Sequence, residues 1–175
     1  LVGSSESSSS AAAVTFDSVF SSTYRAYKVV GMIAPSTSTF VKWRFRASSS
    51  DINSSDYSVA ERNMHVDSSN NVDFQNSAAN NGSTHGLLGG ASCDSDSNND
   101  FIGFDMTIYD PNTDVFGKPV VTGLNTYRNA GSNKIYIGYM GTIMDTNPNA
   151  DGIKFETNAG TLLFHSIRVY GIVNS

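Results

Sequence analysis

Hydrophobic and polar residues alternate along much of the chain with a period of two. The clearest case is the segment 41–47, VKWRFRA, in which apolar residues alternate with basic ones. This pattern is typical of a β-strand with one buried and one exposed face. It therefore predicts a strand with Trp43 in the core and with Lys42, Arg44 and Arg46 on the outer face.

Four further segments show the same period, and no segment has a helical period long enough to predict a helix. The residues expected to face the core are Ile102, Phe104, Met106 and Ile108; Ile135, Ile137, Tyr139 and Ile143; Ile153 and Phe155; and Leu163, Ile167, Val169 and Gly171. Turn-forming residues such as Asp151-Gly152 separate the segments. We therefore expect an all-β chain folded as an antiparallel β-sandwich with jelly-roll topology.

Two regions depart from this pattern. Residues 1–13 are rich in Ser and Ala and have too little apolar surface to order themselves, so they predict an extended N-terminal arm. Such an arm can add as a strand to the sheet edge of a neighbouring copy, with inward contacts from Ala11, Ala13, Val14 and Phe16. The remainder, 14–175, is expected to be a single sandwich domain with a long polar loop at about 67–100.

Composition narrows the function classes. Only 15% of the 175 residues are charged, and the formal net charge is −5. Ser and Asn supply the polarity, together about a quarter of the chain, far above ordinary usage. This balance excludes a binding surface that works through phosphate charge, so no nucleic-acid partner is expected. No apolar run is long enough to predict membrane insertion. A rigid, hydroxyl-rich β domain suits an extracellular setting.

One acidic segment resembles a calcium loop. Oxygen-bearing side chains recur at alternate positions, and a further carboxylate follows; the set is Asp94, Asp96, Asn98, Asp100 and Asp105. Hard cations such as Ca²⁺ prefer oxygen ligands in this kind of arrangement. However, Asn99 stands where calcium loops of the helix-loop-helix type need glycine. The alternative is a polar turn without a ligand, and calcium is the one cofactor that the sequence suggests.

No catalytic group can be identified. Cys93 is the single cysteine and lies in an acidic stretch, which opposes formation of a reactive thiolate. The three histidines, His65, His85 and His165, are not spaced as metal ligands, and His165 shares the phase of the apolar residues of its strand. Motifs for serine nucleophiles, phosphate loops and zinc proteases are missing from the sequence. We therefore predict a non-enzymatic protein.

Binding surfaces are less constrained by the sequence. The basic residues of 41–47 can form a patch for an anion or a partner, or simply a solvated strand face. Seven tyrosines fit glycan contact and subunit packing equally well. They are Tyr24, Tyr27, Tyr57, Tyr109, Tyr127, Tyr136 and Tyr170.

Several segments, taken in order, resemble a domain of tailed-bacteriophage virion proteins, especially tail-fibre and other host-facing components. They are 8–16 (SSSAAAVTF), 42–46 (KWRFR), 54–58 (SSDYS), 108–111 (IYDP) and the closing 164–172 (FHSIRVYGI). The resemblance implies a structural or receptor-binding role in a virion or extracellular fibre, without shared catalytic residues. The expected partners are copies of the chain itself, as a homo-oligomer or filament, and cell-surface glycans. The alternative is a monomeric carbohydrate-binding module.

Overall fold

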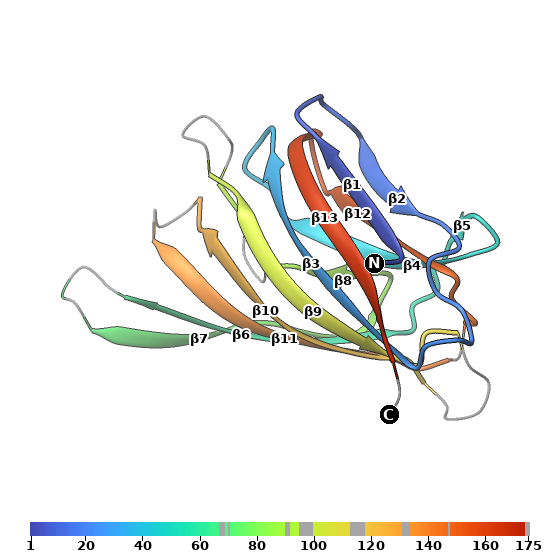
Figure 1. Cartoon of the computed structure of the whole chain (residues 1–175). Coiled ribbons are helices and arrows are strands. Elements are labelled where there is room, and N and C mark those ends of the chain that lie inside the picture. The colour runs from blue at the N-terminus through green and yellow to red at the C-terminus, as the bar shows by residue number, and fades with distance from the viewer. Residues whose placement is uncertain are drawn as a thin grey trace.

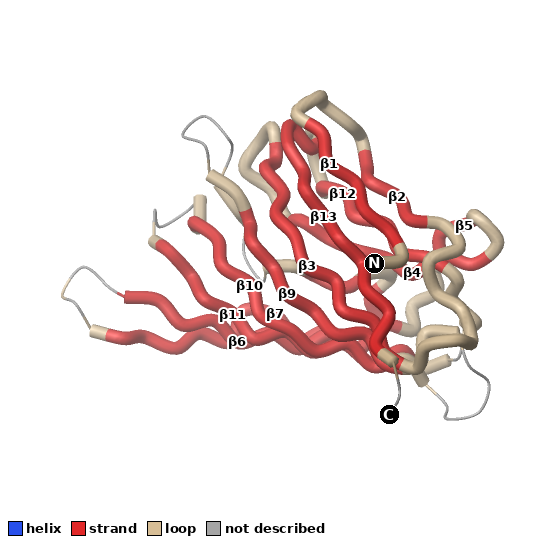
Figure 2. The backbone as a smooth tube through the Cα atoms, viewed as in Figure 1, coloured by secondary structure: helices blue, strands red, loops and turns tan. Residues whose placement is uncertain are grey.

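The computed structural model describes residues 1–66, 69, 71–89, 92–94, 100–112, 118–130, 134–146 and 148–173. Every regular element in this part of the chain is a β-strand (Figure 2), which confirms the all-β class. The strands are β1 (Gly3–Ser7), β2 (Ala13–Phe16), β3 (Ala26–Pro35), β4 (Val41–Ala47), β5 (Ser50–Asp51), β6 (Tyr57–Val66), β7 (Val72–Ser83), β8 (Gly86–Leu87), β9 (Ile102–Tyr109), β10 (Val120–Arg128), β11 (Ile135–Met144), β12 (Gly152–Thr157) and β13 (Leu162–Ile172).

The strands form two antiparallel sheets, which confirms the sandwich (Figure 1). The large sheet has the order β1-β13-β3-β9-β10-β11-β6-β7, and the small sheet has the order β2-β12-β4-β5, with β8 also paired to β4. The chain crosses between the sheets repeatedly, since β1, β3 and β13 belong to the large sheet and β2, β4 and β12 to the small one. Jelly-roll topology stays a prediction.

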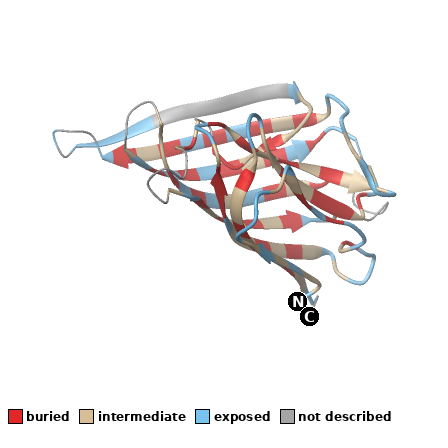
Figure 3. Cartoon of the chain, turned by 90° about the horizontal axis from the view of Figure 1, so that it is seen from above, coloured by how far each residue is buried: buried red, intermediate tan, exposed pale blue. Residues whose placement is uncertain are grey.

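The core lies between the two sheets, whose strands carry the buried residues (Figure 3). It is rich in aromatic residues. Trp43 and Phe45 are fully buried on β4, as their phase predicts, and their rings meet edge to face at 5.2 Å. Tyr57 of the large sheet stacks on Phe45 with ring centroids 6.3 Å apart. Aromatic pairs in such geometries add to the stability that apolar burial provides. Contacts between aromatic rings of the two sheets therefore stabilise the packing of the small sheet on the large one.

The predicted facing of β9, β12 and most of β13 is confirmed, but that of β11 is wrong. Ile135, Ile137, Tyr139 and Ile143 are exposed, and the alternate residues Tyr136, Met140 and Met144 are buried. Gly138 explains the inversion, because it lies between Asn63 on β6 and Asn125 on β10 on the inner face. A Cβ at residue 138 would lie 2.9 Å from Glu61 Oε1 and closer still to both asparagine oxygens, so only glycine fits at this inward-facing position.

The expected N-terminal arm is ordered on its own domain. Residues Gly3–Ser7 form β1 at the edge of the large sheet, paired with β13, and Ala11 forms a bridge with Leu162. Ala13–Phe16 form β2, paired with β12, and the side chains of Val14 and Phe16 enter the core of the same chain. The structure thus places Ala11, Ala13, Val14 and Phe16 within the chain's own sandwich, and their role in assembly stays a prediction.

The polar loop expected at about 67–100 is also corrected. It contains β7, the longest strand of the fold, and the short β8. β7 pairs with β6 through two register shifts, so its sequence does not follow a simple alternation. Bulges of this kind disturb the period of two from which strands are predicted. The segment is also rich in Asn and Ser, so it lacks the alternation of apolar and polar residues from which a strand is predicted.

Strands β10, β11, β6 and β7 form one half of the large sheet, here called the wing. In Figure 1 the wing extends away from the side of the sandwich where β2, β12 and β5 lie. The inner faces of β6 and β11 are buried, whereas the outer face of the wing points away from the small sheet. The wing therefore presents to solvent a broad surface of its own.

Candidate functional site

Among the described residues, no three His, Cys, Asp or Glu side chains cluster as a metal site, so the structure does not bring Asp94, Asp100 and Asp105 together as one. Asp105 lies on β9, where it forms an ion pair with Lys28. Asp100 forms an ion pair with Arg128 at 3.2 Å, and Asp94 accepts a hydrogen bond from Ser38 at 3.1 Å. Asp96 and Asn98 lie outside the described residues. Each described carboxylate thus has a protein partner, and calcium binding stays a prediction.

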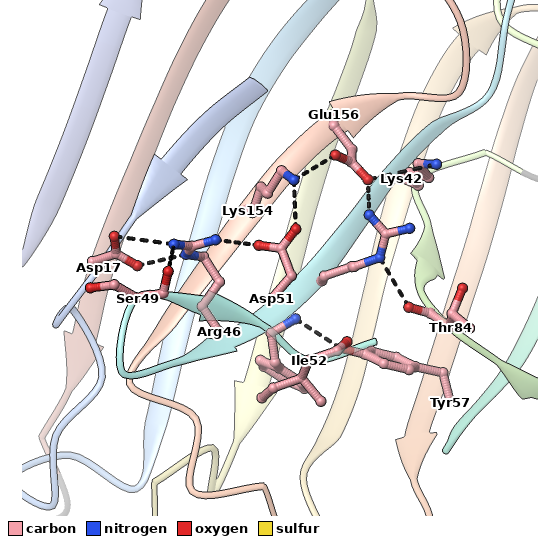
Figure 4. Close-up of polar contacts among 12 residues, drawn as sticks. Asp17, Lys42, Arg46, Ser49, Asp51, Ile52, Tyr57, Thr84, Lys154 and Glu156 are labelled. Carbon is pink, nitrogen blue, oxygen red and sulfur yellow. Dashed lines mark hydrogen bonds and ion pairs between the residues drawn. The ribbon is translucent and has the colours of Figure 1, made fainter. Parts of the chain in front are cut away.

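The basic residues of β4 belong to an ion-pair network rather than to an open cationic patch (Figure 4). The network covers the outer face of the small sheet, where Glu156 and Lys154 of β12 lie opposite Lys42 and Arg44 of β4. Arg44 pairs with Glu156, and Lys154 donates to Asp51 at 2.6 Å. The remaining pairs are Arg46 with Asp17 and with Asp51, Lys42 with Glu156, and Lys154 with Glu156.

The network is shielded from water. At its centre, the side chain of Arg46 is 12% exposed, and those of Asp51 and Lys154 are each 18% exposed. Burial alone raises the pKa of the Asp51 carboxyl, but the hydrogen bonds and charges of Lys154 and Arg46 hold it below its usual value. Conversely, burial and the charge of Arg44 lower the pKa of Lys42. The charged form of Asp51 is therefore stabilised by its cationic neighbours, whereas the charged form of Lys42 is destabilised by burial and by like charges. The arrangement joins strands of one sheet and leaves little charge to attract a ligand.

The histidines and the cysteine occupy structural positions. His165 is buried on β13, as its phase predicts, and its Nε2 lies 2.9 Å from Ser5 Oγ on β1. His65 is stacked on Tyr136 at 4.6 Å, and its Nε2 lies 3.0 Å from Lys134 Nζ. Burial, followed by the charge of Glu61, raises the pKa of the Cys93 thiol to about 12. A thiol in this state is not a nucleophile.

The inner face of the wing is unusually polar. Asn63 and Asn125 lean over Gly138 from the two neighbouring strands, and both are fully buried. Asn63 Nδ2 donates to the Tyr127 hydroxyl at 2.7 Å, and Asn125 Nδ2 donates to Glu61 Oε1 at 2.8 Å. These two hydrogen bonds link side chains of β6 and β10 across Gly138 of β11, while the amide oxygens Asn63 Oδ1 and Asn125 Oδ1 lie buried without a hydrogen-bond partner among the described residues. The backbone ladders align β6 and β10 on either side of β11.

That alignment places apolar side chains on the outer face of the wing. We call this surface the wing face; its members are Met64 and Val66 of β6, Val72 and Phe74 of β7, Leu124 of β10, and Ile135, Ile137 and Tyr139 of β11. In one row across the strands, Phe74 lies opposite Met64, and Met64 lies opposite Ile137. In the next row, Arg62 lies opposite Tyr139, and Tyr139 lies opposite Leu124. The surface is contiguous across four strands.

The wing face is large for a solvent-exposed surface. Tyr139 is 63% exposed and Ile135 is 61% exposed, and seven of the eight members are large apolar residues with more than a third of their surface open. Together they expose on the order of 800 Å², more than the ~300–600 Å² of the largest patch on a typical monomer. Surfaces of that size mark contact sites for other molecules. This is the strongest candidate site in the described part of the chain.

Sequence reasoning missed the wing face for a definite reason. The segment 135–144 has apolar residues in both phases, so alternation alone does not tell which phase is exposed. The signal that would have found it is Gly138. A glycine flanked by large residues in a strand marks a close approach by neighbouring side chains. Placing Gly138 inward sends Ile137 and Tyr139 outward.

Searches against protein-family models, curated proteins and solved structures find no match for this chain. The resemblance to phage virion domains therefore stays a prediction. None of the described elements is an apolar helix long enough to cross a bilayer.

Proposed function

We propose that the chain is a non-enzymatic structural subunit of a virion or extracellular fibre, and that it associates with copies of itself through the wing face. The single observation that carries this proposal is the exposed, contiguous apolar surface on β6, β7, β10 and β11. Apolar surface left in water is unfavourable by about 25 cal/mol per Å². Burying a sheet face of this size against another molecule therefore lowers the free energy considerably.

A second copy of the chain is the occupant that best fits. The exposed area is on the order of 800 Å², which is what one partner contributes to an interface of standard size. Two flat, apolar sheet faces pack well on each other, as the two layers of any sandwich do. The centre of the surface carries one charged described side chain, Arg62, and its guanidinium lies 5.2 Å from the centre of the Phe74 ring.

Composition supports the same role. The low charge content and the excess of Ser and Asn suit a rigid domain that packs into an assembly outside a cell. The resemblance to phage virion proteins points in the same direction. Association through a sheet face takes the place of the arm exchange expected from the sequence, since β1 and β2 are held within the chain.

The test compares two glutamate substitutions on the outer face of the same sheet. Ile137→Glu places a charge at the centre of the wing face, and Thr107→Glu places one on β9, outside it. We expect wild type and Thr107→Glu to form dimers or larger species at micromolar concentration by light scattering, and Ile137→Glu to be monomeric. Circular dichroism checks that both variants fold.

Two results would contradict the proposal. If wild type stays monomeric at every concentration, the chain does not self-associate, and retention of that monomer on a glycan array would support the carbohydrate-binding alternative. If Ile137→Glu associates as strongly as wild type, the wing face is not the contact.

A further inference from the structure

The wing face also indicates how two copies stack, an inference that rests on the proposed self-association. In its central row, the order of residues from β7 to β10 is Phe74, Met64, Ile137 and Thr126. In the adjacent row, Arg62 on β6 lies opposite Tyr139 on β11. Arg62 is the feature that distinguishes one stacking from another, because its charge needs a suitable partner when water is excluded.

Two symmetric stackings keep the strands of both copies aligned, as packed sheets prefer. A two-fold axis perpendicular to the strands, through the central row, lays β6 of one copy on β6 of the other. It places Arg62 against Val66 of the second copy, because these residues lie on opposite sides of Met64. Covering a guanidinium with an aliphatic side chain is costly.

A two-fold axis parallel to the strands, between β6 and β11, lays β6 of one copy on β11 of the other. It places Arg62 of each copy on the Tyr139 ring of its partner, because the two residues share a row. A guanidinium over an aromatic ring is attractive, and more so when water is excluded. Met64 of one copy then meets Ile137 of the other. Arg128, at the end of the row of Ile135, lies over an aliphatic side chain in both stackings, Val72 here and Leu124 in the alternative, so it favours neither.

We infer that the chain forms a closed, two-fold dimer in which the wings stack face to face, β6 on β11, with Arg62 of each copy on Tyr139 of the other. Such an interface is self-complementary and uses up the wing face, so the dimer does not extend into a fibre through this surface. Any filament then grows from dimers through other surfaces.

Cross-linking distinguishes the two stackings because Phe74 and Thr126 lie three strands apart, roughly 14 Å at a strand spacing of ~4.8 Å. In the inferred dimer, Phe74 of one copy lies over Thr126 of the other. In the alternative, Phe74 lies over Phe74. Both positions are exposed, and the native Cys93 is buried, so single-cysteine labelling is practical. The probe is a short bis-maleimide.

We expect Phe74→Cys and Thr126→Cys chains to cross-link when mixed, and each variant alone to cross-link far less. Cross-linking of Phe74→Cys with itself would overturn the inferred stacking, as would a wild-type dimer in which no combination cross-links; both results leave the proposed self-association intact. A wild type that never dimerises overturns the proposed function itself. As a second readout, Arg62→Ala and Tyr139→Ala should each weaken dimerisation by roughly 5- to 30-fold.

Discussion

Gly138 lies directly opposite Asn63 in the β11–β6 ladder, and the missing side chain of the glycine leaves the space into which the Asn63 amide leans. Asn125 approaches the same space from β10. This contact sets which side of β11 faces the core, and therefore which side carries the wing face.

Replacing Gly138 with alanine should destabilise the fold. The new methyl group would be closer than 3 Å to Asn63 Oδ1, Asn125 Oδ1 and Glu61 Oε1, all within a buried region that cannot expand freely. Overpacking of this kind costs about 1–3 kcal/mol. The free energy of unfolding in urea measures the loss. Gly141→Ala on the same strand is the control, because its Cβ would be 3.9 Å from the nearest atom, Ala60 O, and a comparable loss there would contradict the explanation.

The sequence was sufficient to predict which side chains face the core in strands where one phase is apolar and the other polar. In β4 the basic residues fix the facing of Trp43, and in β9 the polar residues fix the facing of Met106. It was insufficient where both phases are apolar, as in β11, and where bulges break the period, as in β7. The wing face depends on both of these strands, so alternation could not reveal it.

The sequence predicts the basic residues of the ion-pair network but not most of their acidic partners. The sequence places Lys42, Arg44 and Arg46 on one strand face, but of their partners only Asp51 is near in the sequence. Glu156 and Lys154 lie on β12, and Asp17 follows β2. Only strand pairing brings them opposite β4, and no local pattern specifies that pairing.

Asp51 should make the protein sensitive to acid below about pH 4. Its pKa is held below the ordinary value of 3.8, so its charged form stabilises the fold above that pH, and the stabilisation is lost as pH falls through the lowered pKa. Asp51→Asn should therefore lose less stability between pH 5 and pH 2 than wild type does. Chemical unfolding at several pH values provides the measurement.

At pH 7 the same variant should cost about 1–2 kcal/mol, because it removes the shared partner of Arg46 and Lys154 in a partly buried site. Asp145→Asn serves as the control, since Asp145 pairs with Lys118 at 3.6 Å on an open surface, where ion pairs contribute about 0–1 kcal/mol. Equal effects at the two sites would argue against a cooperative network.

His85 should titrate far below an ordinary histidine. Burial, and then the positive charges of Lys42 and Arg44, lower its pKa to about 4. An unfolded histidine has a pKa near 6.5, so the unfolded chain binds the proton more readily and stability should fall as pH drops from 6.5 to 4, with no further loss from this group below that. NMR titration of the imidazole signals measures the pKa directly.

The control for this titration is His85→Gln, which should remove the signal and flatten the stability curve between pH 6.5 and pH 4. A His85 signal that titrates near 6.5 in the folded protein would show that the network does not act on it.

Cys93 should be inert in the folded protein. Its thiol is buried and has a pKa of about 12, so little thiolate exists at pH 8. Maleimide labelling followed by mass spectrometry should find no modification of native protein and complete modification in urea. Ser22→Cys should add one rapidly labelled thiol, because that position is exposed and lies outside the wing face. Rapid labelling of Cys93 in native protein would contradict its burial and its raised pKa.

Sedimentation velocity of the unmodified chain, from low micromolar to millimolar concentration, tests the central claim most directly. The account predicts a sedimentation coefficient that rises with concentration to that of a compact dimer of the 18.7 kDa chain. A single species of 18.7 kDa across the whole range would contradict it, because the apolar side chains of β6, β7, β10 and β11 would then stay in contact with water.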